Sequence, residues 1–218
     1  MHDRIDGPHQ GNNPVLSGAP LGEAAGAVIL IHGRGANAHD LLPLEGEFDI
    51  PSLAYVALQA SGNSWYPLSF LAPVAQNEPY LTSALQLVGD TVGMLAENGL
   101  KREKIALLGF SQGACLSLEF AARHPERIGA VIAFSGGLIG APGSLFEPDG
   151  TLENVPVFLG CSDVDPHIPE ERVRESAALF QQMGAAVTLR LYPGMGHTLN
   201  RDEIDRAREI LDRLVSDI

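Results

Sequence analysis

The chain has 218 residues, which suits one domain with a sizeable core and would be cramped for two, and 45% of its residues are apolar. Its formal net charge of −13 would repel a phosphate backbone, and no Lys/Arg cluster reverses that field locally. This charge argues against nucleic-acid binding and against stable association with an anionic membrane. No apolar run approaches the roughly 20 residues that a transmembrane helix requires.

The first 25 residues are rich in Gly, Pro, Asn and His, a composition that predicts a loose N-terminal leader or an edge hairpin. The opening residues, Met1 to Asp6, lack the basic-then-apolar layout of a signal peptide, so we expect a cytoplasmic protein. The two cysteines, Cys115 and Cys161, lie in apolar stretches without a CxxC spacing. Free, buried thiols are the expected state in that compartment.

Short apolar runs alternate with longer amphipathic ones from Ala27 onward. The runs are about five to seven residues long and nearly continuous in apolar character, which predicts strands covered on both faces. They are Ala27–Ile31, Leu53–Leu58, Ile105–Phe110, Ile128–Phe134, Val155–Leu159 and Val187–Leu191.

Helices are predicted between and after these runs. Glu78–Asn98 carries an apolar stripe at spacings of three and four residues, and Gln112–Arg123 forms a second helix. Pro169–Met183 begins with a proline suited to the first turn and is followed by a glycine suited to the cap. The last helix opens with Asn200 as cap and Glu203 three residues on, a capping-box variant. Its apolar stripe is Ile204, Ala207, Leu211, Leu214 and Ile218.

Strand–helix alternation with apolar strands predicts an α/β protein with a mostly parallel sheet and helices on both faces. Functional groups in such a fold gather at the carboxyl ends of the strands. This rule can be tested on the polar residues that follow each predicted strand.

The strongest motif is Gly109-Phe110-Ser111-Gln112-Gly113, a GxSxG between a predicted strand and a predicted helix. A serine on such a turn is held in a strained backbone conformation with its hydroxyl projected outward. The flanking glycines are needed because a side chain at either place would collide with the neighbouring strand or helix. The alternatives are an ordinary Gly-rich turn or a phosphate loop, and the context favours Ser111 as a nucleophile.

A serine hydroxyl is a poor nucleophile until a base removes its proton. The candidate base is His197, in a Gly-rich loop after the strand Val187–Leu191 and therefore at the same sheet edge as Ser111. The alternative is an ordinary surface histidine.

The imidazole needs an acid to fix its tautomer and to stabilise its protonated form. Asp163 and Asp165 both follow the strand Val155–Leu159. We favour Asp165, because the prolines at 166 and 169 fix it just ahead of the next helix, and we expect Asp163 to brace the loop. The order Ser, Asp, His along the chain, each after a different strand, is the order expected for this hydrolase architecture.

The segment Ile31-His32-Gly33-Arg34-Gly35 follows the first strong strand and can present a backbone N–H to an oxyanion. We expect the backbone N–H groups of Arg34 and Gln112 to be the two donors. The Arg34 guanidinium would only make the pocket rim less apolar. His32 is expected to be a buried histidine that braces loops, in preference to a catalytic group.

The largest apolar cluster predicted to lie in a loop consists of Trp65, Tyr66, Phe70 and Leu71. Apolar loop residues near a catalytic edge often line an acyl pocket, which makes these four candidate substrate-binding residues. The alternative is a small satellite core beneath the loop.

The chain resembles the phospholipase/carboxylesterase family of α/β-hydrolases, which includes the acyl-protein thioesterases. The resemblance covers nearly the whole chain from about Ala19. It rests on His32-Gly33-Arg34-Gly35, Gly109-Phe110-Ser111-Gln112-Gly113, Asp163-Val164-Asp165-Pro166-His167-Ile168-Pro169 and Gly194-Met195-Gly196-His197.

The resemblance implies a catalytic triad of Ser111, Asp165 and His197, with the backbone amides of Arg34 and Gln112 as the oxyanion hole. It also implies a single α/β-hydrolase domain over residues 1–218 without a large cap domain. The activity implied is hydrolysis of esters or thioesters of modest acyl length, without a metal or other cofactor.

Arg34 and His167 depart from the thioesterase branch, which usually has a leucine and an aliphatic residue there, and residues 63–71 differ as well. We therefore expect a carboxylesterase-type serine hydrolase that cleaves small to medium esters through an acyl-Ser111 intermediate. An acyl thioesterase or lysophospholipase on the same triad is the alternative. The expected partner is a small-molecule ester, and a homodimer is left open.

Three further classes are less favoured. A metal-dependent enzyme would use Asp163, Asp165 and His167, but their alternating spacing on a loop suits a closed site poorly. A non-catalytic module would have no reason to retain Ser, Asp and His together. A lyase or dienelactone-type hydrolase needs a cysteine nucleophile, whereas position 111 is serine and Cys115 lies one helical turn inside.

Overall fold

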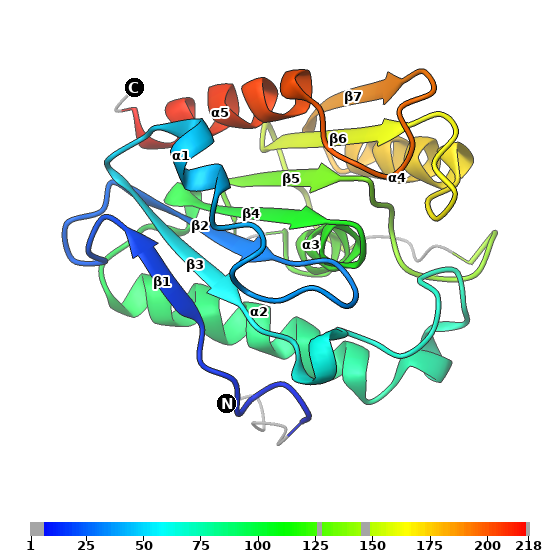
Figure 1. Ribbon diagram of the computed structural model, residues 1–218, viewed down its shortest axis with the longest axis horizontal. Helices are drawn as coiled ribbons and strands as arrows, with labels where there is room; N and C mark the ends of the chain where they lie inside the picture. The colour runs from blue at the N-terminus through cyan, green and yellow to red at the C-terminus, as the bar shows by residue number, and fades with distance from the viewer. Residues whose placement is uncertain (1–6, 126–127, 145–148, 217–218) are drawn as a thin grey trace.

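The computed structural model describes residues 7–125, 128–144 and 149–216. Their strands form one seven-stranded sheet in the order β1-β3-β2-β4-β5-β6-β7, parallel throughout except for β1 at one edge. The strands are β1 (Val15–Gly18), β2 (Gly26–Ile31), β3 (Leu53–Leu58), β4 (Ile105–Phe110), β5 (Ala130–Phe134), β6 (Pro156–Ser162) and β7 (Ala186–Tyr192). The carboxyl ends of β4 to β7 therefore meet along one edge (Figure 1).

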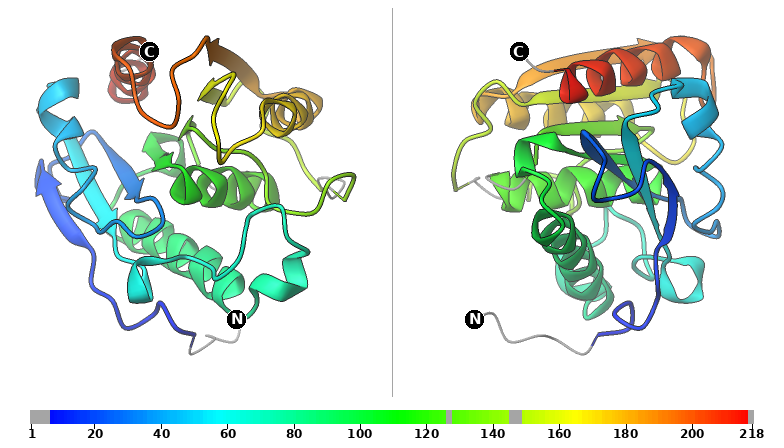
Figure 2. Two further views of the ribbon diagram at one scale, coloured as in Figure 1. Left: turned by 45° about the vertical axis from the view of Figure 1, so that its right-hand side comes forward. Right: turned by 90° about the vertical axis from the view of Figure 1, so that its left-hand side faces the viewer.

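Helices cover both faces of this sheet, as the strand–helix alternation predicts. One face carries α2 (Tyr80–Glu97), α3 (Gln112–Arg123) and α4 (Glu170–Gln182), and the other carries α1 (Leu44–Phe48) and α5 (Arg201–Val215). Figure 2 shows α5 and α2 on opposite sides of the strands. Short 3-10 turns are η1 (Ser61–Asn63), η2 (Val74–Asn77) and η3 (Arg102–Lys104). None of the helices in the described ranges is long and apolar enough to cross a bilayer.

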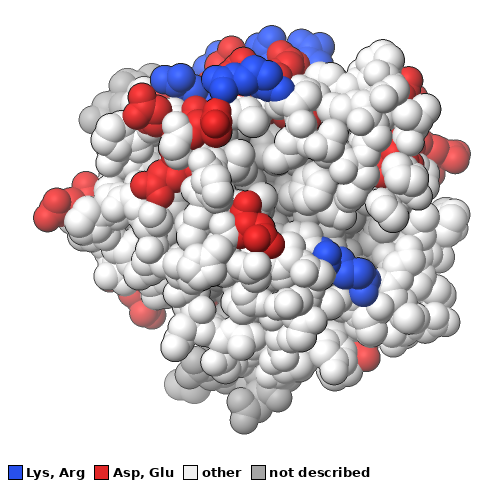
Figure 3. All heavy atoms as spheres, in the orientation of Figure 1, with Lys and Arg blue, Asp and Glu red and all other residues white. Residues whose placement is uncertain are grey.

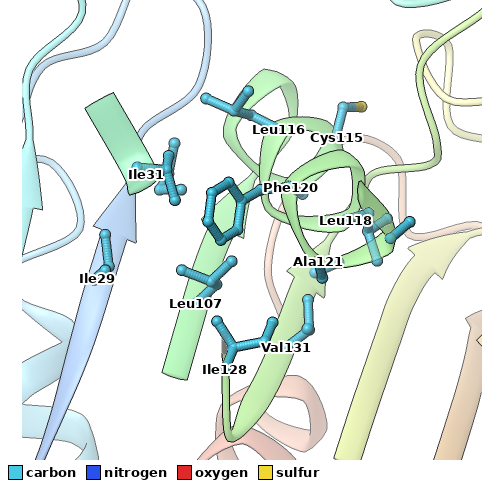
Figure 4. Packing of buried hydrophobic residues seen from close by; sticks show 14 of the residues in the cluster. Ile29, Ile31, Leu107, Cys115, Leu116, Leu118, Phe120, Ala121, Ile128 and Val131 are labelled. Carbon is cyan, nitrogen blue, oxygen red and sulfur yellow. The ribbon is translucent and has the colours of Figure 1, made fainter. Parts of the chain in front are cut away.

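Two apolar cores lie above and below the central strands, because successive side chains of a strand point to opposite faces. Ile29, Ile31 and Leu107 belong to the core under α2, α3 and α4, whereas Val28 and Leu30 belong to the core under α1 and α5. Figure 4 shows Phe120 of α3 reaching toward Ile31 and Leu107. Burial on both faces holds the central strands firmly, so the loops at their carboxyl ends start from fixed positions.

The outer strand β7 differs from its prediction. The run Val187–Leu191 was expected to be covered on both faces, but Thr188 and Arg190 are exposed while Val187 and Leu189 pack against the core. The prediction was wrong because this run alternates apolar and polar residues, the pattern of a strand with one solvated face.

The N-terminal segment is neither a loose leader nor a hairpin over the part that is described, residues 7–25. β1 pairs with β3 instead of its neighbour in sequence, and His9 ahead of it is fully buried. Both ring nitrogens of His9 have partners in the loop of residues 61–65. Nδ1 accepts a hydrogen bond from the backbone N–H of Ser61 at 3.0 Å, and Nε2 lies 3.0 Å from the Trp65 carbonyl oxygen. Residues 1–6 of the predicted leader lie outside the described residues.

The start of α5 is the predicted capping box. The side chain of Asn200 accepts from the backbone N–H of Glu203 at 3.1 Å, and Glu203 Oε2 accepts from the backbone N–H of Asn200 at 2.9 Å. Glu203 is fully buried, and its Oε1 has no hydrogen-bond partner among the described residues. Burial raises the pKa of Glu203 to about 7. Ile218, the last predicted residue of the α5 stripe, lies outside the described residues.

The buried His9 ring gives a first test of the fold. His9→Ala removes the partner of the Trp65 carbonyl and of the Ser61 N–H, so we expect the free energy of unfolding to fall by about 2–3 kcal/mol. Urea denaturation measures this loss, and His39→Ala, at an exposed position, should change stability by less than about 0.5 kcal/mol. Equal effects of the two substitutions would contradict the docking of the N-terminal segment.

Glu203 gives a second test, through pH. Its raised pKa means that the folded state binds the proton more tightly than the unfolded state, so stability is lost as pH rises from near 4.5 through about 7. Glu203→Gln removes this ionisation. We expect the free energy of unfolding of the variant, relative to that of the parent protein, to rise by about 2 kcal/mol when the pH is raised from about 5 to about 8.5. Thermal unfolding at both pH values measures this change. A stability difference between the two proteins that is the same at both pH values would argue against a raised pKa for Glu203.

Candidate active site

Ser111 stands on a strained turn between β4 and α3. Its backbone has φ 55° and ψ −119°, outside the regions that residues with side chains ordinarily adopt. A Cβ at Gly113 would lie 1.9 Å from the Ile31 carbonyl oxygen of β2, and one at Gly109 would lie 2.3 Å from the Gly113 backbone. Both glycines of the motif are therefore required by close backbone contacts, as predicted.

The three residues predicted as a triad lie together at the carboxyl edge of the sheet, after β4, β6 and β7. His197 Nε2 lies 2.9 Å from Ser111 Oγ, and His197 Nδ1 lies 2.7 Å from Asp165 Oδ2. The rings of Phe110 and His167 flank the imidazole, each with a centroid 4.9 Å away. The geometry allows a proton to pass between the serine hydroxyl and the imidazole while the carboxylate holds the opposite nitrogen.

Asp165 is held as a carboxylate by several donors. Burial on its own would raise its pKa, but hydrogen bonds from His197 and from the backbone N–H groups of His167 and Ile168 outweigh this effect and hold the pKa below its ordinary value. Asp163 has a different contact: its Oδ1 accepts from the backbone N–H of Gly194, at 2.8 Å. Asp165 therefore contacts the imidazole and Asp163 braces the loop, and the role of Asp165 as the acid stays a prediction.

The loop after β2 approaches the same edge. The backbone N–H of Gly35 donates to the Asn63 carbonyl at 2.7 Å, which fixes the turn. Neither Arg34 nor Gln112 has an acceptor for its backbone N–H among residues 7–125, 128–144 and 149–216. The Gln112 N–H is one of the free donors at the start of α3.

His32 is the buried, bracing histidine that was expected. Its Nε2 accepts from the backbone N–H of Ala60 at 3.1 Å, so Nδ1, which lies 2.7 Å from the Gly33 carbonyl, carries the proton. Burial lowers the pKa of His32 and keeps the ring neutral.

A pocket of about 530 Å³ opens above Ser111 and His197. Tyr66 and Phe70 lie in its wall, as predicted, whereas Trp65 and Leu71 do not. The expectation that all four line the pocket is therefore wrong for those two. Trp65 is fully buried and donates from Nε1 to the His32 carbonyl at 2.8 Å, so it belongs to the core beneath the loop, the alternative considered for this cluster.

The side chain of Gln112 connects the pocket wall to the turn that carries Ser111. Its side-chain Oε1 accepts from the backbone N–H of Trp65 at 2.9 Å, and its Nε2 donates to the Tyr66 carbonyl at 2.8 Å. The sequence predicted only the backbone role of this residue. The buried amide could not be assigned from the motif, because its partners are 46 and 47 residues away.

Several pocket residues were not predicted from the sequence. Phe110, His167 and Ile168 line the pocket, as do Leu68, Ser69 and Cys115. Phe110 and His167 lie within the motifs, and that position was the only signal available for them. The parallel topology predicts that these segments share one sheet edge, but it does not predict which rings contact His197 there.

The contacts in the pocket give no support to a cysteine nucleophile or to a metal-dependent enzyme, two of the less favoured classes. Burial raises the pKa of Cys115 to about 12, which keeps its thiol protonated and unsuited to act as a nucleophile at neutral pH. In the part of the chain that is described, no three His, Cys, Asp or Glu side chains converge as a metal site.

Comparison with known proteins decides the family. Residues 18–215 match the model described as Phospholipase/Carboxylesterase. The chain belongs to this family. This family groups carboxylesterases with acyl-protein thioesterases, and the chain has the α/β-hydrolase fold that was predicted.

Individual relatives agree with this assignment. The crystal structure of a phospholipase/carboxylesterase from Dyadobacter fermentans is 43% identical, covering 93% of this chain and 97% of that one, with a TM-score of 0.89. Acyl-protein thioesterase 1 of Gibberella zeae is 31% identical over 53% of this chain and 50% of that protein. The same-named protein of Saccharomyces cerevisiae is 29% identical over 62% of this chain and 60% of that protein. The chain thus matches only about half to three fifths of the length of these two thioesterases.

Proposed function

We propose that the protein is a carboxylesterase-type hydrolase that cleaves carboxylic esters of small to medium acyl length through an acyl-Ser111 intermediate. The observation that carries this proposal is the continuous chain of contacts from Asp165 through His197 to Ser111, at 2.7 and 2.9 Å. At these distances the imidazole accepts the serine proton, and the adjacent carboxylate stabilises the imidazolium that results.

Acylation begins with attack of Ser111 Oγ on the ester carbonyl carbon while His197 Nε2 takes the hydroxyl proton. The carbonyl oxygen becomes an oxyanion, which accepts hydrogen bonds from the backbone N–H groups of Arg34 and Gln112. When the carbon–oxygen bond to the alcohol breaks, His197 returns its proton to the leaving oxygen. The alcohol departs and the acyl group stays on Ser111.

Deacylation repeats these steps with water. His197 removes a proton from a water molecule, whose oxygen attacks the acyl carbon and forms a second oxyanion at the same two donors. Collapse of this intermediate breaks the bond to Ser111 Oγ, and His197 gives the proton back to that oxygen. The carboxylic acid leaves and the free enzyme is restored.

The pocket supports a modest acyl group. Its volume of about 530 Å³ lies within the range of small-molecule sites, and Leu68, Phe70 and Ile168 give it an apolar wall. Tyr66 and Cys115 border it and are themselves buried against the core, so the wall there cannot recede without disturbing packed side chains.

Thioester hydrolysis on the same three residues is the second candidate. The names of the two fungal relatives favour it, and the attack on a thioester carbonyl would follow the same steps. We place the ester first because Arg34 and His167 stand at the pocket, where the thioesterase branch was expected to have aliphatic side chains. A small-molecule partner, a cytoplasmic location and the absence of nucleic-acid or membrane binding stay predictions.

An active-site probe tests the nucleophile. A fluorophosphonate should label the parent protein covalently and fail to label Ser111→Ala, because only an activated serine attacks the phosphorus. Mass spectrometry of the labelled peptide identifies the site. Ser117→Ala, on the same helix but outside the pocket, is the matched control and should label normally. Equal labelling of the parent protein and Ser111→Ala would refute the assignment.

A pair of aspartate variants tests the acid. Asp165→Asn loses the charge that stabilises the imidazolium, so we expect kcat/KM for p-nitrophenyl butyrate to fall by about 10³–10⁴-fold. Asp163→Asn keeps an oxygen that can accept from Gly194, and its activity should fall less than about tenfold. The reverse ranking would transfer the role to Asp163.

A further inference from the structure

The pocket is free of acidic side chains although the whole chain carries a net charge of −13. Among the described residues that line it, Arg34 is charged, His167 and His197 carry imidazoles, and none is Asp or Glu. Most basic side chains on the face seen in Figure 3 gather along its upper margin, where α5 lies, while one acidic and one basic side chain stand near the middle among uncharged atoms. The positive charge of Arg34 therefore stands apart from the general charge pattern.

The guanidinium of Arg34 has only neutral partners. Its Nη1 donates to Ser64 Oγ at 3.1 Å and to the Pro67 carbonyl at 2.9 Å, and its Nη2 donates to the Leu68 carbonyl. Within the described ranges it forms no ion pair, and Nε–H and one Nη2–H have no acceptor. The side chain is exposed at the pocket, so its positive charge and two unused N–H donors remain available to a bound molecule.

Two aspartates of the loops at this edge of the sheet, Asp40 and Asp165, have other partners than Arg34. Asp40 accepts from the backbone and side chain of Asn37, and Asp165 is occupied by His197 and by two backbone N–H groups. Neither of these aspartates lines the pocket. A carboxylate supplied by the substrate would therefore meet no competing or repelling group on the pocket wall.

His167 lies across the nucleophile from Arg34. Arg34 follows β2 and His167 follows β6, and these strands flank β4 and β5 in the sheet. The His167 side chain is exposed, lines the pocket, and has no hydrogen bond among the described residues. An ester bound at Ser111 thus lies between a cation on one side and an imidazole with free nitrogens on the other.

We propose that the preferred substrates are esters that carry a carboxylate, on the acyl or the alcohol part, which binds the two free N–H groups of Arg34. A carboxylate accepts two parallel hydrogen bonds from a guanidinium, which an ester without a charge cannot do. His167 gives a second, weaker contact at the other side of the pocket. This inference rests on the proposed function, because it names the substrate class of the same site.

Two pairs of esters test the proposal, and each pair consists of a charged ester and its neutral isostere. A pH-stat measures the release of acid during hydrolysis. The first pair is methyl hydrogen succinate and methyl 4-methylpentanoate, and the second is 3-(butanoyloxy)propanoate and 3-methylbutyl butanoate. The readout is the ratio of kcat/KM for the charged ester to kcat/KM for its neutral isostere. Any general effect of a variant on the loop or on the oxyanion donor cancels in this ratio.

We expect Arg34→Met to lower this ratio about tenfold or more for at least one pair, and Arg34→Lys to lower it less. Arg213→Met is the matched control, because it removes the same charge near the opposite edge, where Leu214 and Val215 contact the starts of β5 and β2. It should leave the ratio unchanged. A ratio that Arg34→Met changes by less than about twofold in both pairs would overturn the proposal and leave the esterase activity standing.

A binding measurement separates this proposal from the proposed function. Succinate is titrated calorimetrically into Ser111→Ala and into the same variant carrying Arg34→Met. We expect the second protein to bind succinate about tenfold more weakly or more. If the parent protein hydrolyses none of the four esters, the proposed function fails while weaker binding still supports the anionic ligand. Equal binding by the two proteins, or none by either, overturns the anionic ligand.

Discussion

The active edge depends on the close approach of α3 to the end of β2. A Cβ at Gly113 would lie 1.9 Å from the Ile31 carbonyl oxygen, so the first turn of the helix lies directly against the neighbouring strand. That contact forces the backbone of Ser111 into its strained conformation and aims its hydroxyl at the pocket. It also brings the N–H of Gln112 and the loop that carries Arg34 to one side of the nucleophile. The two buried cores supply the packing that maintains this strain.

The sequence allowed the sheet and the approach of Ser111, Asp165 and His197 to be predicted, because both leave local signals. Apolar runs give strands, the GxSxG motif gives the turn, and residues after β6 and β7 share its edge through the parallel topology. Pro166 and Pro169 even separated Asp165 from Asp163 correctly as the partner of His197. These inferences needed chain order and spacing alone.

The parts that escaped prediction depend on contacts between distant segments. His9 lies in a stretch of loop-forming residues, and its burial follows only from Ser61, Trp65 and Ser83, which surround it. Trp65 is an aromatic residue like its neighbours Tyr66 and Phe70, and its place in the core follows from contacts with His32, Gln112 and His9, which lie far from it in the sequence. The error on β7 was of another kind, since its alternating pattern was present in the sequence.

Gln112 connects two parts of the candidate site. Its backbone follows Ser111, and its amide side chain holds the loop that forms the pocket wall. In the proposed mechanism, an acyl group too bulky for that wall would displace the side chain of the residue whose backbone N–H binds the oxyanion. Under that proposal, the size of the acyl group affects the rate of reaction as well as binding, and a change to the pocket wall at this loop also changes the catalytic step.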